Sequence, residues 1–302
     1  MRVLLPIIYH ELTKCIERAF QEEGHEVRVV DWRKYSRQPA KVEALCIEQA
    51  RQFNPDFAFC QFQSPGMITH KFPEVLKDIG CFSVNWTGDV RAPLPQWYVD
   101  LAPYFSVTAF SNMTDVDALR KMGYRSEHVQ IGYDDRIYNS DGTAERSGAV
   151  FIGNNYGGYK YSESESRRQM VKLLEAELGD RFKVYGMPWP NGFYLSEPDD
   201  AKILREAAVA INWDHFHRPW FASDRLLRAT ACGCATVSQH YEGLSTEHPS
   251  VVGVNSPEDV VKAVRLLLDN PNTADKVGKI SAIHTKNNHL WNNRVKQMTA
   301  WV

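Results

Sequence analysis

The feature that most constrains the fold is a regular alternation of short apolar runs with amphipathic helical stretches. Apolar runs predict strands at residues 2–8, 26–31, 56–62, 81–86, 105–110, 129–131, 149–153, 182–185, 209–213, 235–238 and 251–254. Helical stretches lie between several of them, such as residues 166–178, which end before Gly179. Strands that alternate with helices predict α/β architecture, with parallel sheets covered by helices on both faces.

The chain has 302 residues, which is long for one hydrophobic core and favours two domains. Residues 132–148 are polar and rich in turn-forming residues, so they are the best candidate linker. We therefore predict two doubly wound, Rossmann-like domains, at residues 1–140 and 141–285. Within them, Thr114 and Asp117 fit a capping box, and Ser256 and Asp259 fit another, with Pro257 in the first turn.

The composition limits which binding partners and which cellular compartment are expected. The net charge is −2, the pI is about 6.6 and no run of Lys or Arg occurs, which disfavours nucleic acid without excluding a local basic cleft. The six cysteines lie mostly in apolar segments and are expected to be buried free thiols, since Cys232-Gly-Cys234 lacks zinc spacing. The opening apolar run is too short for a secretion signal, and no segment reaches the ~20 apolar residues of a membrane span. We expect a cytoplasmic protein.

In doubly wound sheets, ligands bind at the carboxyl ends of the strands, so the loops there are the candidate sites. The first loop, residues 153–160, begins Gly153-Asn154-Asn155 and ends with Lys160. Glycines let backbone N–H groups approach a phosphate, and Lys160 adds positive charge. The loop matches neither a Walker motif nor a complete G-x-G-x-x-G, so a plain surface turn is the alternative.

A second candidate is the helix that begins at Ser223. Its N-terminus carries partial positive charge, and Arg225 lies in its first turn, which suits an anionic diphosphate. Asp224 is either part of that site or an ordinary first-turn acid. Tyr185 and Gly186 end another strand, where an aromatic ring and a bare backbone could hold a base or a sugar.

A third candidate is the pair of Asn-Trp sequences that close one strand in each domain, Asn85-Trp86 and Asn212-Trp213. Thr87-Gly88-Asp89 and Arg91 follow the first, and Asp89 is the candidate general base or acceptor-orienting group. Its alternative role is to cap a turn. Asp214, His215, His217 and Arg218 follow the second pair. The histidines lack a third ligand, so we predict that they line the cleft and bind no metal.

These loops resemble, in order and spacing, the group-1 branch of GT-B glycosyltransferases that includes CgeB-like proteins. The resemblance rests on residues 149–154, 182–186 and 223–233, on 291–294, and on Ser111-Asn112 with Gly123 and Ile131-Gly132. It implies a GT-B fold whose two domains face each other across a cleft. The first domain would bind the acceptor and the second the nucleotide sugar. Residues 286–302 would form a helix that crosses back to the first domain.

The resemblance assigns roles to the candidates. The catalytic residues would be Asp89 and Arg91. The donor-binding residues would be Gly153, Asn154, Asn155, Lys160, Tyr185, Gly186, Asn212, Trp213, Asp214, Ser223, Asp224, Arg225 and Glu242. The acceptor-binding residues would be Trp86, Thr87, Gly88, His215 and Arg218. The enzyme would need no metal or cofactor, with a nucleotide-sugar co-substrate, a UDP-sugar being favoured.

One position departs from the family. Many relatives carry a Glu that holds the donor ribose five residues before the glycine that follows the helix, and this chain has Arg228 there. Either Glu242 takes its place or the donor is held differently. The departure leaves open the donor and whether the sugar is transferred with retention or inversion.

The sequence therefore predicts a glycosyltransferase that moves a sugar from a nucleotide-diphosphate sugar to an acceptor hydroxyl. A DNA acceptor is one alternative, because similar small transferases of phage decorate hydroxymethylated bases and several arginines could contact phosphates: Arg91, Arg167, Arg168, Arg218 and Arg228. Two further hypotheses are a sugar-nucleotide epimerase of the same shape and a non-catalytic two-lobed binding protein. The oligomeric state is not predicted.

Overall fold

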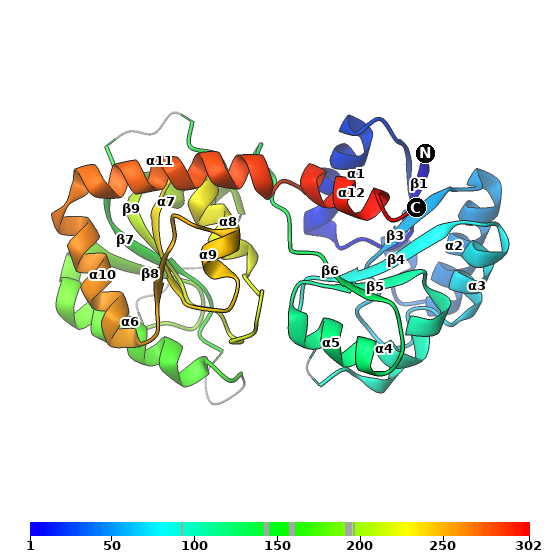
Figure 1. Ribbon diagram of the computed structural model, residues 1–302, viewed down its shortest axis with the longest axis horizontal. Helices are drawn as coiled ribbons and strands as arrows, with labels where there is room; N and C mark the ends of the chain where they lie inside the picture. The colour runs from blue at the N-terminus through cyan, green and yellow to red at the C-terminus, as the bar shows by residue number, and fades with distance from the viewer. Residues whose placement is uncertain (92, 142–144, 157–160, 191–194, 196) are drawn as a thin grey trace. The chain divides into compact units, whose positions relative to one another are not determined.

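A computed structural model describes residues 1–91, 93–141, 145–156, 161–190, 195 and 197–302. The chain forms two compact units: unit 1 comprises residues 1–131 and 291–302, and unit 2 comprises residues 132–290. The boundary between unit 1 and unit 2 lies between residues 131 and 132, whereas the sequence predicted it between residues 140 and 141. The chain returns to unit 1 at Trp291, where the sequence suggested residue 286 (Figure 1).

Unit 1 is built on a sheet whose described strands are ordered β2-β1-β3-β4-β5-β6 and pair in parallel throughout. Its strands are β1 (Arg2–Leu5), β2 (Glu26–Val29), β3 (Phe57–Cys60), β4 (Phe82–Thr87), β5 (Val107–Phe110) and β6 (Ser126–His128). Its helices are α1 (His10–Glu22), η1 (Arg33–Tyr35), α2 (Pro39–Phe53), α3 (Lys71–Asp78), α4 (Gln96–Leu101), η2 (Ala102–Tyr104), α5 (Met113–Lys121) and α12 (Trp291–Thr299).

Both faces of this sheet are buried, because alternate residues of each parallel strand point to opposite sides. Val3 and Leu5 of β1 join a cluster that includes Ile16 and Phe20 of α1. α12 packs on the same face, where the ring of Trp291 lies in that cluster. Leu4 and Ala58 turn the other way and pack with α2 and α3. The last helix of the chain therefore completes the core of unit 1.

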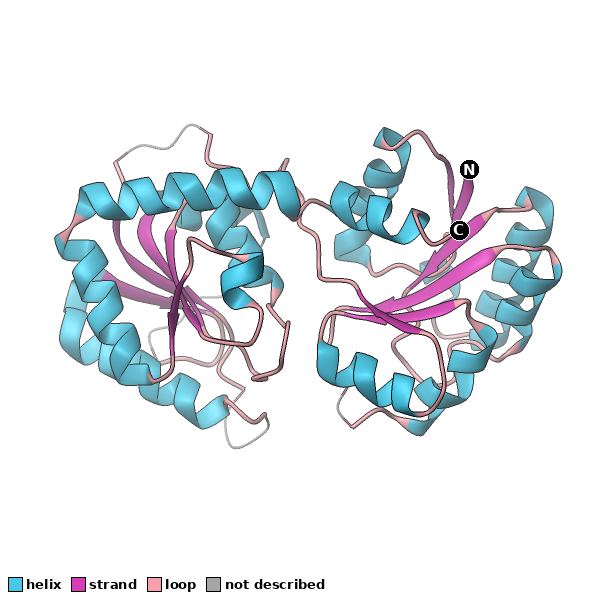
Figure 2. Ribbon diagram, viewed as in Figure 1, coloured by secondary structure: helices cyan, strands magenta, loops and turns pink. Residues whose placement is uncertain are grey.

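Unit 2 has a second parallel sheet, with its described strands ordered β11-β10-β9-β7-β8 (Figure 2). Its strands are β7 (Ser147–Ile152), β8 (Phe182–Tyr185), β9 (Ala207–Asn212), β10 (Ala235–Gln239) and β11 (Val252–Val254). Its helices are α6 (Ser164–Leu178), η3 (Gly179–Arg181), α7 (Glu197–Glu206), α8 (Asp224–Ala231), α9 (Leu244–Glu247), α10 (Pro257–Asp269) and α11 (Pro271–Asn288).

The core of unit 2 repeats the two-sided pattern. Phe151 of β7 and Ile211 of β9 face α6 and α10, in a cluster with Met170 and Val264. Helices α7 and α8 contact strands β7, β9 and β10 and supply the next layer. The predicted fold class, two doubly wound α/β domains, is confirmed.

Two local predictions need correction. The strand expected at 129–131 lies at 126–128, where Ser126 pairs with Thr108, and Val129 is buried in the core instead. The helix expected to be capped by Thr114 is capped by Asn112, whose side chain accepts from the Asp115 backbone N–H at 2.9 Å. Ser256 caps α10 as predicted, by accepting from the backbone N–H of Asp259.

Candidate functional site

Strand order locates the candidate site of unit 2. β7 comes first in the chain but lies between β8 and β9, so the connections after β7 and after β9 leave on opposite sides of the sheet. Such a switch point opens a crevice outside the carboxyl ends of the strands, where ligands of doubly wound folds bind. The residues that follow β7 are 153–155, and those that follow β9 are 213–215. Both sets were among the predicted site residues.

The loop after β7 is locked onto the loop after β8. The Gly153 N–H donates to the Tyr185 carbonyl at 2.8 Å, and the Met187 N–H donates to the Asn154 side chain at 2.9 Å. Gly186 has φ +126°, and a Cβ there would lie 2.4 Å from the Gly153 carbonyl oxygen. Only glycine fits this approach. The structure therefore brings together Gly153, Tyr185 and Gly186, three predicted site residues from two strand ends.

Asn155 continues this contact, because its N–H donates to the Met187 carbonyl at 3.0 Å and its side chain donates to the Pro188 carbonyl at 3.2 Å. The loop is thus held through three successive residues. Lys160, the cation predicted for the same loop, lies outside the described residues, as do Gly157, Gly158 and Tyr159.

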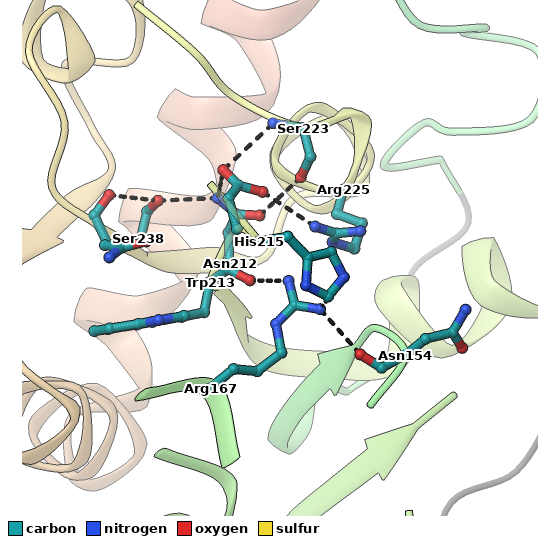
Figure 3. Close-up of polar contacts among 10 residues, drawn as sticks. Asn154, Arg167, Asn212, Trp213, His215, Ser223, Arg225 and Ser238 are labelled. Atoms are coloured by element: carbon teal, nitrogen blue, oxygen red, sulfur yellow. Dashed lines mark hydrogen bonds and ion pairs between the residues drawn. The ribbon is translucent and has the colours of Figure 1, made fainter. Parts of the chain in front are cut away.

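A polar network connects β9, β10 and the start of α8 (Figure 3). The Asn212 amide donates to Asp214 and to the Ser238 hydroxyl, both at 3.1 Å, and its carbonyl accepts from the Ser223 hydroxyl at 3.1 Å. Arg225 pairs with Asp214 at 3.1 Å. Of the two charged side chains, Arg225 is 24% exposed and Asp214 6%. A ligand that reaches this edge from solvent therefore meets the guanidinium group.

Arg167 of α6 ties the two strand ends together from inside. Its Nη1 donates to the Asn154 carbonyl at 3.0 Å, and its Nη2 donates to the Trp213 carbonyl, although the residue is only 1% exposed (Figure 3). Burial, and then the positive charge of Arg225, lower the pKa of Arg167 well below its usual value, while Asp214 opposes them. A buried guanidinium with these partners fixes the ends of β7 and β9 in place.

Arg167 also contacts His215. Its Nη1 lies 2.6 Å from His215 Nε2, and a guanidinium group only donates hydrogen bonds. The His215 ring packs against Tyr156 and Tyr161, with centroids 4.6 and 4.9 Å away. We predicted His215 on the acceptor side, but it lies among the donor candidates of unit 2.

The start of α8 differs from the usual capped helix. Ser223 is the N-cap residue, yet its hydroxyl donates to Asn212 and makes no cap hydrogen bond. Asp224 forms an ion pair with Arg228 at 2.7 Å, and Arg228 also pairs with Asp200 of α7 at 3.0 Å. Arg228, found where relatives carry a Glu, thus holds two carboxylates. The side chain of Asp224 is more exposed than that of Asp200.

Two further predicted residues of unit 2 lie on loops after β9 and β10. Arg218 donates to the His217 carbonyl at 3.0 Å. Glu242 has an exposed side chain, and its carbonyl accepts from the Trp220 N–H at 2.7 Å. Neither side chain enters the network around Asp214. Trp213 contributes its carbonyl, but its ring is buried in the core of unit 2.

In unit 1, the predicted residues after β4 divide into buried and exposed ones. Trp86 lies in the core with its ring 5.2 Å from that of Trp291, and its Nε1 donates to the Val129 carbonyl. Its ring is therefore unavailable as an acceptor surface, which corrects that prediction. Thr87 is buried and accepts from the Asp89 N–H at 3.1 Å. These buried residues shape the loop rather than contact a ligand.

Asp89 and Arg91 are the reachable part of this loop. The Asp89 carboxylate is 71% exposed and forms an ion pair with Arg91 at 3.4 Å. The Arg91 N–H donates to the Asp115 carboxylate at 2.6 Å, and Asp115 is fully buried at the start of α5. The Gly88 carbonyl accepts from the Ser111 hydroxyl at 2.9 Å. The loop is thus preorganised, with the Asp89 carboxylate at the surface and the Arg91 side chain mostly buried beside it.

The sequence analysis missed Asp115, Ser238 and the structural role of Arg167. One signal was available, because Arg167 precedes Met170 and Leu174 by three and seven residues, the spacing of the inward face of α6. As a buried side chain, Arg167 cannot serve as the surface phosphate contact that we considered for DNA. Arg228 forms ion pairs with two carboxylates, those of Asp200 and Asp224.

Two searches cover the described part of the chain. It contains no group of three or more His, Cys, Asp or Glu side chains placed to hold a metal ion. None of its helices has both the length and the apolar character that crossing a membrane requires. All six cysteines are buried and unbridged, as expected from their apolar neighbours.

Comparison with known proteins gives one family match, over part of the chain. Residues 166–300 match the family described as glycosyl transferase-like. A search of curated proteins finds no match. Among similar solved structures is a trehalose-6-phosphate synthase studied with bisubstrate glycomimetics, at a TM-score of 0.65 and 11% identity, with 99% of this chain and 98% of that chain covered.

Two other structures cover the whole chain. HepE of Anabaena, in complex with UDP and glucose, gives a TM-score of 0.62 at 10% identity and is covered over 100% of its length. Sucrose-phosphate synthase from Thermosynechococcus elongatus gives 0.60 at 10% identity, with 98% of that chain covered. The narrower likeness to CgeB-like proteins stays a prediction. The chain has the GT-B fold, its residues 166–300 match the glycosyl transferase-like family, and the predicted resemblance to GT-B glycosyltransferases is confirmed.

Proposed function

We propose that this protein transfers a sugar from a nucleotide-diphosphate sugar, and that the carboxyl edge of the unit 2 sheet binds the donor. The observation that carries the proposal is the network of Asn212, Asp214, Ser223 and Arg225, which presents a guanidinium group at the start of a helix. Positive charge at a helix N-terminus favours a diphosphate. The match of residues 166–300 to a glycosyl transferase-like family supports the same interpretation.

The chemical role of this site would be to stabilise the leaving group. As the glycosidic bond breaks, negative charge grows on the diphosphate and positive charge on the sugar ring. Arg225 would neutralise the diphosphate beside the loop at 153–155. Asp214 and Arg167 would hold these groups in place, so little reorganisation would be needed during the reaction.

The pair of Asp89 and Arg91 in unit 1 would serve the acceptor. Asp89 would orient the attacking hydroxyl or accept its proton, and Arg91 would fix the carboxylate. A UDP-sugar is the favoured donor, because HepE of similar fold was solved with UDP and glucose. Asp224, Glu242 and Tyr185 remain proposed donor contacts, as does Lys160.

Release of nucleotide tests this proposal. The protein is incubated with UDP-, GDP- and ADP-sugars, and free nucleoside diphosphate is measured with and without candidate acceptors. Faster release from one donor when an acceptor is present is expected. If none of the three nucleotides is released or bound at millimolar concentration, the proposed function is wrong. Release of free sugar without any acceptor would instead favour an epimerase or hydrolase of the same fold.

A further inference from the structure

A groove of about 310 Å³ lies on unit 1, apart from the loop of Asp89 and Arg91. Its walls come from the loop between β3 and α3 and from the segment formed by α4 and η2. The lining residues are Gly66, Ile68, Thr69, His70, Trp97, Asp100, Leu101 and Tyr104. None of them was predicted as a site residue, so the proposed function leaves this groove unused.

One part of the lining is aromatic. The ring centroids of His70 and Tyr104 lie 5.4 Å apart, and the two rings are tilted by 31°. Trp97 is half-buried, and its ring packs at 5.1 Å and 69° against Tyr98, which is buried in the core. Trp97 is thus anchored from behind while part of it lines the groove. Three rings from two segments offer flat apolar surface at a site that solvent reaches.

The other part of the lining is polar and fixed. The N–H and hydroxyl groups of Thr69 both donate to one oxygen of the buried Glu43, at 2.7 and 2.8 Å. Asp100 is exposed, and its Oδ1 accepts from Gln96 at 2.8 Å, which orients the carboxylate on α4. Asp100 can therefore accept a hydrogen bond from a ligand, and the Thr69 loop is held before any ligand binds.

The charge of the groove lining indicates which kind of ligand could stack on its aromatic rings. Proteins that bind single-stranded nucleic acid combine such rings with a positively charged groove that follows the phosphates. The described residues that line this groove include no Lys or Arg, and Asp100 would repel a phosphate. A neutral ligand ring with one apolar face and hydroxyl groups on its edge can stack on the aromatic side chains and donate to Asp100, and it carries no phosphate for Asp100 to repel. Sugars have this form.

We propose that this groove binds a neutral carbohydrate. An apolar face of a sugar ring stacks on Trp97 and Tyr104, and a hydroxyl group donates to Asp100. If the protein transfers sugars as proposed above, this carbohydrate is the acceptor or the part of it that extends from the reacting hydroxyl. Binding in the groove itself does not depend on that function.

Titration tests the groove directly. Neutral tetrasaccharides of glucose, galactose, mannose and N-acetylglucosamine, together with an oligothymidylate of four residues, are titrated by calorimetry into the parent and each variant. The indole N–H signal of Trp97 is followed by NMR in the parent. At least one tetrasaccharide is expected to bind and to shift that signal. Trp97→Ala and, independently, Asp100→Ala are each expected to weaken binding about tenfold. Tyr35→Ala, a half-buried aromatic of unit 1 outside the groove, is the control and should not weaken it.

The proposal is wrong if no tetrasaccharide binds at 10-millimolar levels, roughly the weak limit of specific recognition. It is equally wrong if both variants bind as the parent does, or if the oligothymidylate binds more tightly. Asp100 is exposed, so its variant keeps the test valid even if Trp97→Ala does not fold. UDP is titrated into the same samples. Saccharide binding without UDP binding would contradict the proposed function and support the carbohydrate groove. UDP binding without saccharide binding would support the proposed function and contradict the groove.

Discussion

The two sheets place different chemistry at equivalent edges. In unit 2, charged side chains hold the carboxyl ends of the strands: Arg167 bonds to the ends of β7 and β9, and Arg225 pairs with Asp214. In unit 1, amides share this task with the buried Asp115 carboxylate and with Arg33, which is only partly buried and donates to the Ile8 carbonyl at 3.0 Å. Gln61 accepts from the Tyr9 N–H at 2.8 Å, and Asn85 accepts from the Phe62 N–H at 3.0 Å.

This difference indicates what each edge binds. Burying a guanidinium group costs several kcal/mol unless its hydrogen bonds and nearby charges offset the loss of water. Neutral amides fix a loop at much lower cost. Unit 2 differs from unit 1 in fully burying a guanidinium group, that of Arg167, at its strand ends. Under the proposed function, the diphosphate would bind at unit 2 and a neutral ligand at unit 1.

The largest effect is expected for Arg167→Met. The change leaves the carbonyls of Asn154 and Trp213 without their buried donor, so the free energy of unfolding should fall by about 3 kcal/mol. Urea unfolding measures it. Arg168→Met is the matched control, because this neighbour forms an exposed pair with Glu165 and should change stability by less than about 1 kcal/mol. Equal effects of the two variants would show that Arg167 does not brace the crevice.

Arg225→Gln should weaken UDP binding about 30-fold, since a charge-assisted contact contributes about 2 kcal/mol. Calorimetry measures the affinity, and Arg225→Lys should recover part of it by restoring the charge. Arg181→Gln is the control, because Arg181 forms an exposed pair with Asp269 away from the network. If Arg225→Gln bound UDP as tightly as the control, the diphosphate would have to lie elsewhere.

Asp115→Ala tests the unit 1 side of the comparison. The Asp115 carboxylate accepts from the Arg91 N–H and from the Asn112 side chain, so its loss should reduce the free energy of unfolding by about 1.5 kcal/mol. The affinity for UDP should stay unchanged. Chemical denaturation and UDP titration on the same sample check both statements. A loss of UDP affinity as large as that in Arg225→Gln would contradict the division of roles.

The smallest effect concerns pH and Asp200. Burial raises the pKa of Asp200 above its ordinary 3.8, against the opposing effect of Arg228 and the hydrogen bond from Tyr138. The folded state then binds more protons than the unfolded state from about pH 4 upward, so this group's contribution to stability falls as pH rises. The stability of the parent minus that of Asp200→Asn should therefore fall as pH increases above about 4. A rising difference would mean that Arg228 dominates.

The sequence predicted the fold well because parallel strands buried on both faces are continuous apolar runs. It failed at β6, where Ser126-Glu127-His128 form an edge strand with no apolar pattern. The apolar residues that follow, such as Val129, are buried by packing in the core and not by strand pairing. The apolar pattern of a short segment predicts that its side chains are buried, but it does not show whether strand pairing or core packing buries them.

The site was predictable only in part. The loops after β7, β8 and β9 could be found, because strand ends locate ligand sites in this fold. The role of Arg167 could not, since its carbonyl partners lie 13 and 46 residues away and carry no side-chain signal. Trp86 was misassigned because position after a strand does not distinguish a ring in the core from one at the surface.

Calorimetric titration with UDP and with uridine tests the central claim most directly, because the two ligands differ only in the diphosphate. The account predicts that UDP binds at least about 100-fold more tightly than uridine, through two or more charge-assisted contacts, and that Arg225→Gln removes most of this difference. Equal affinities for UDP and uridine, or an unchanged difference in Arg225→Gln, would contradict it.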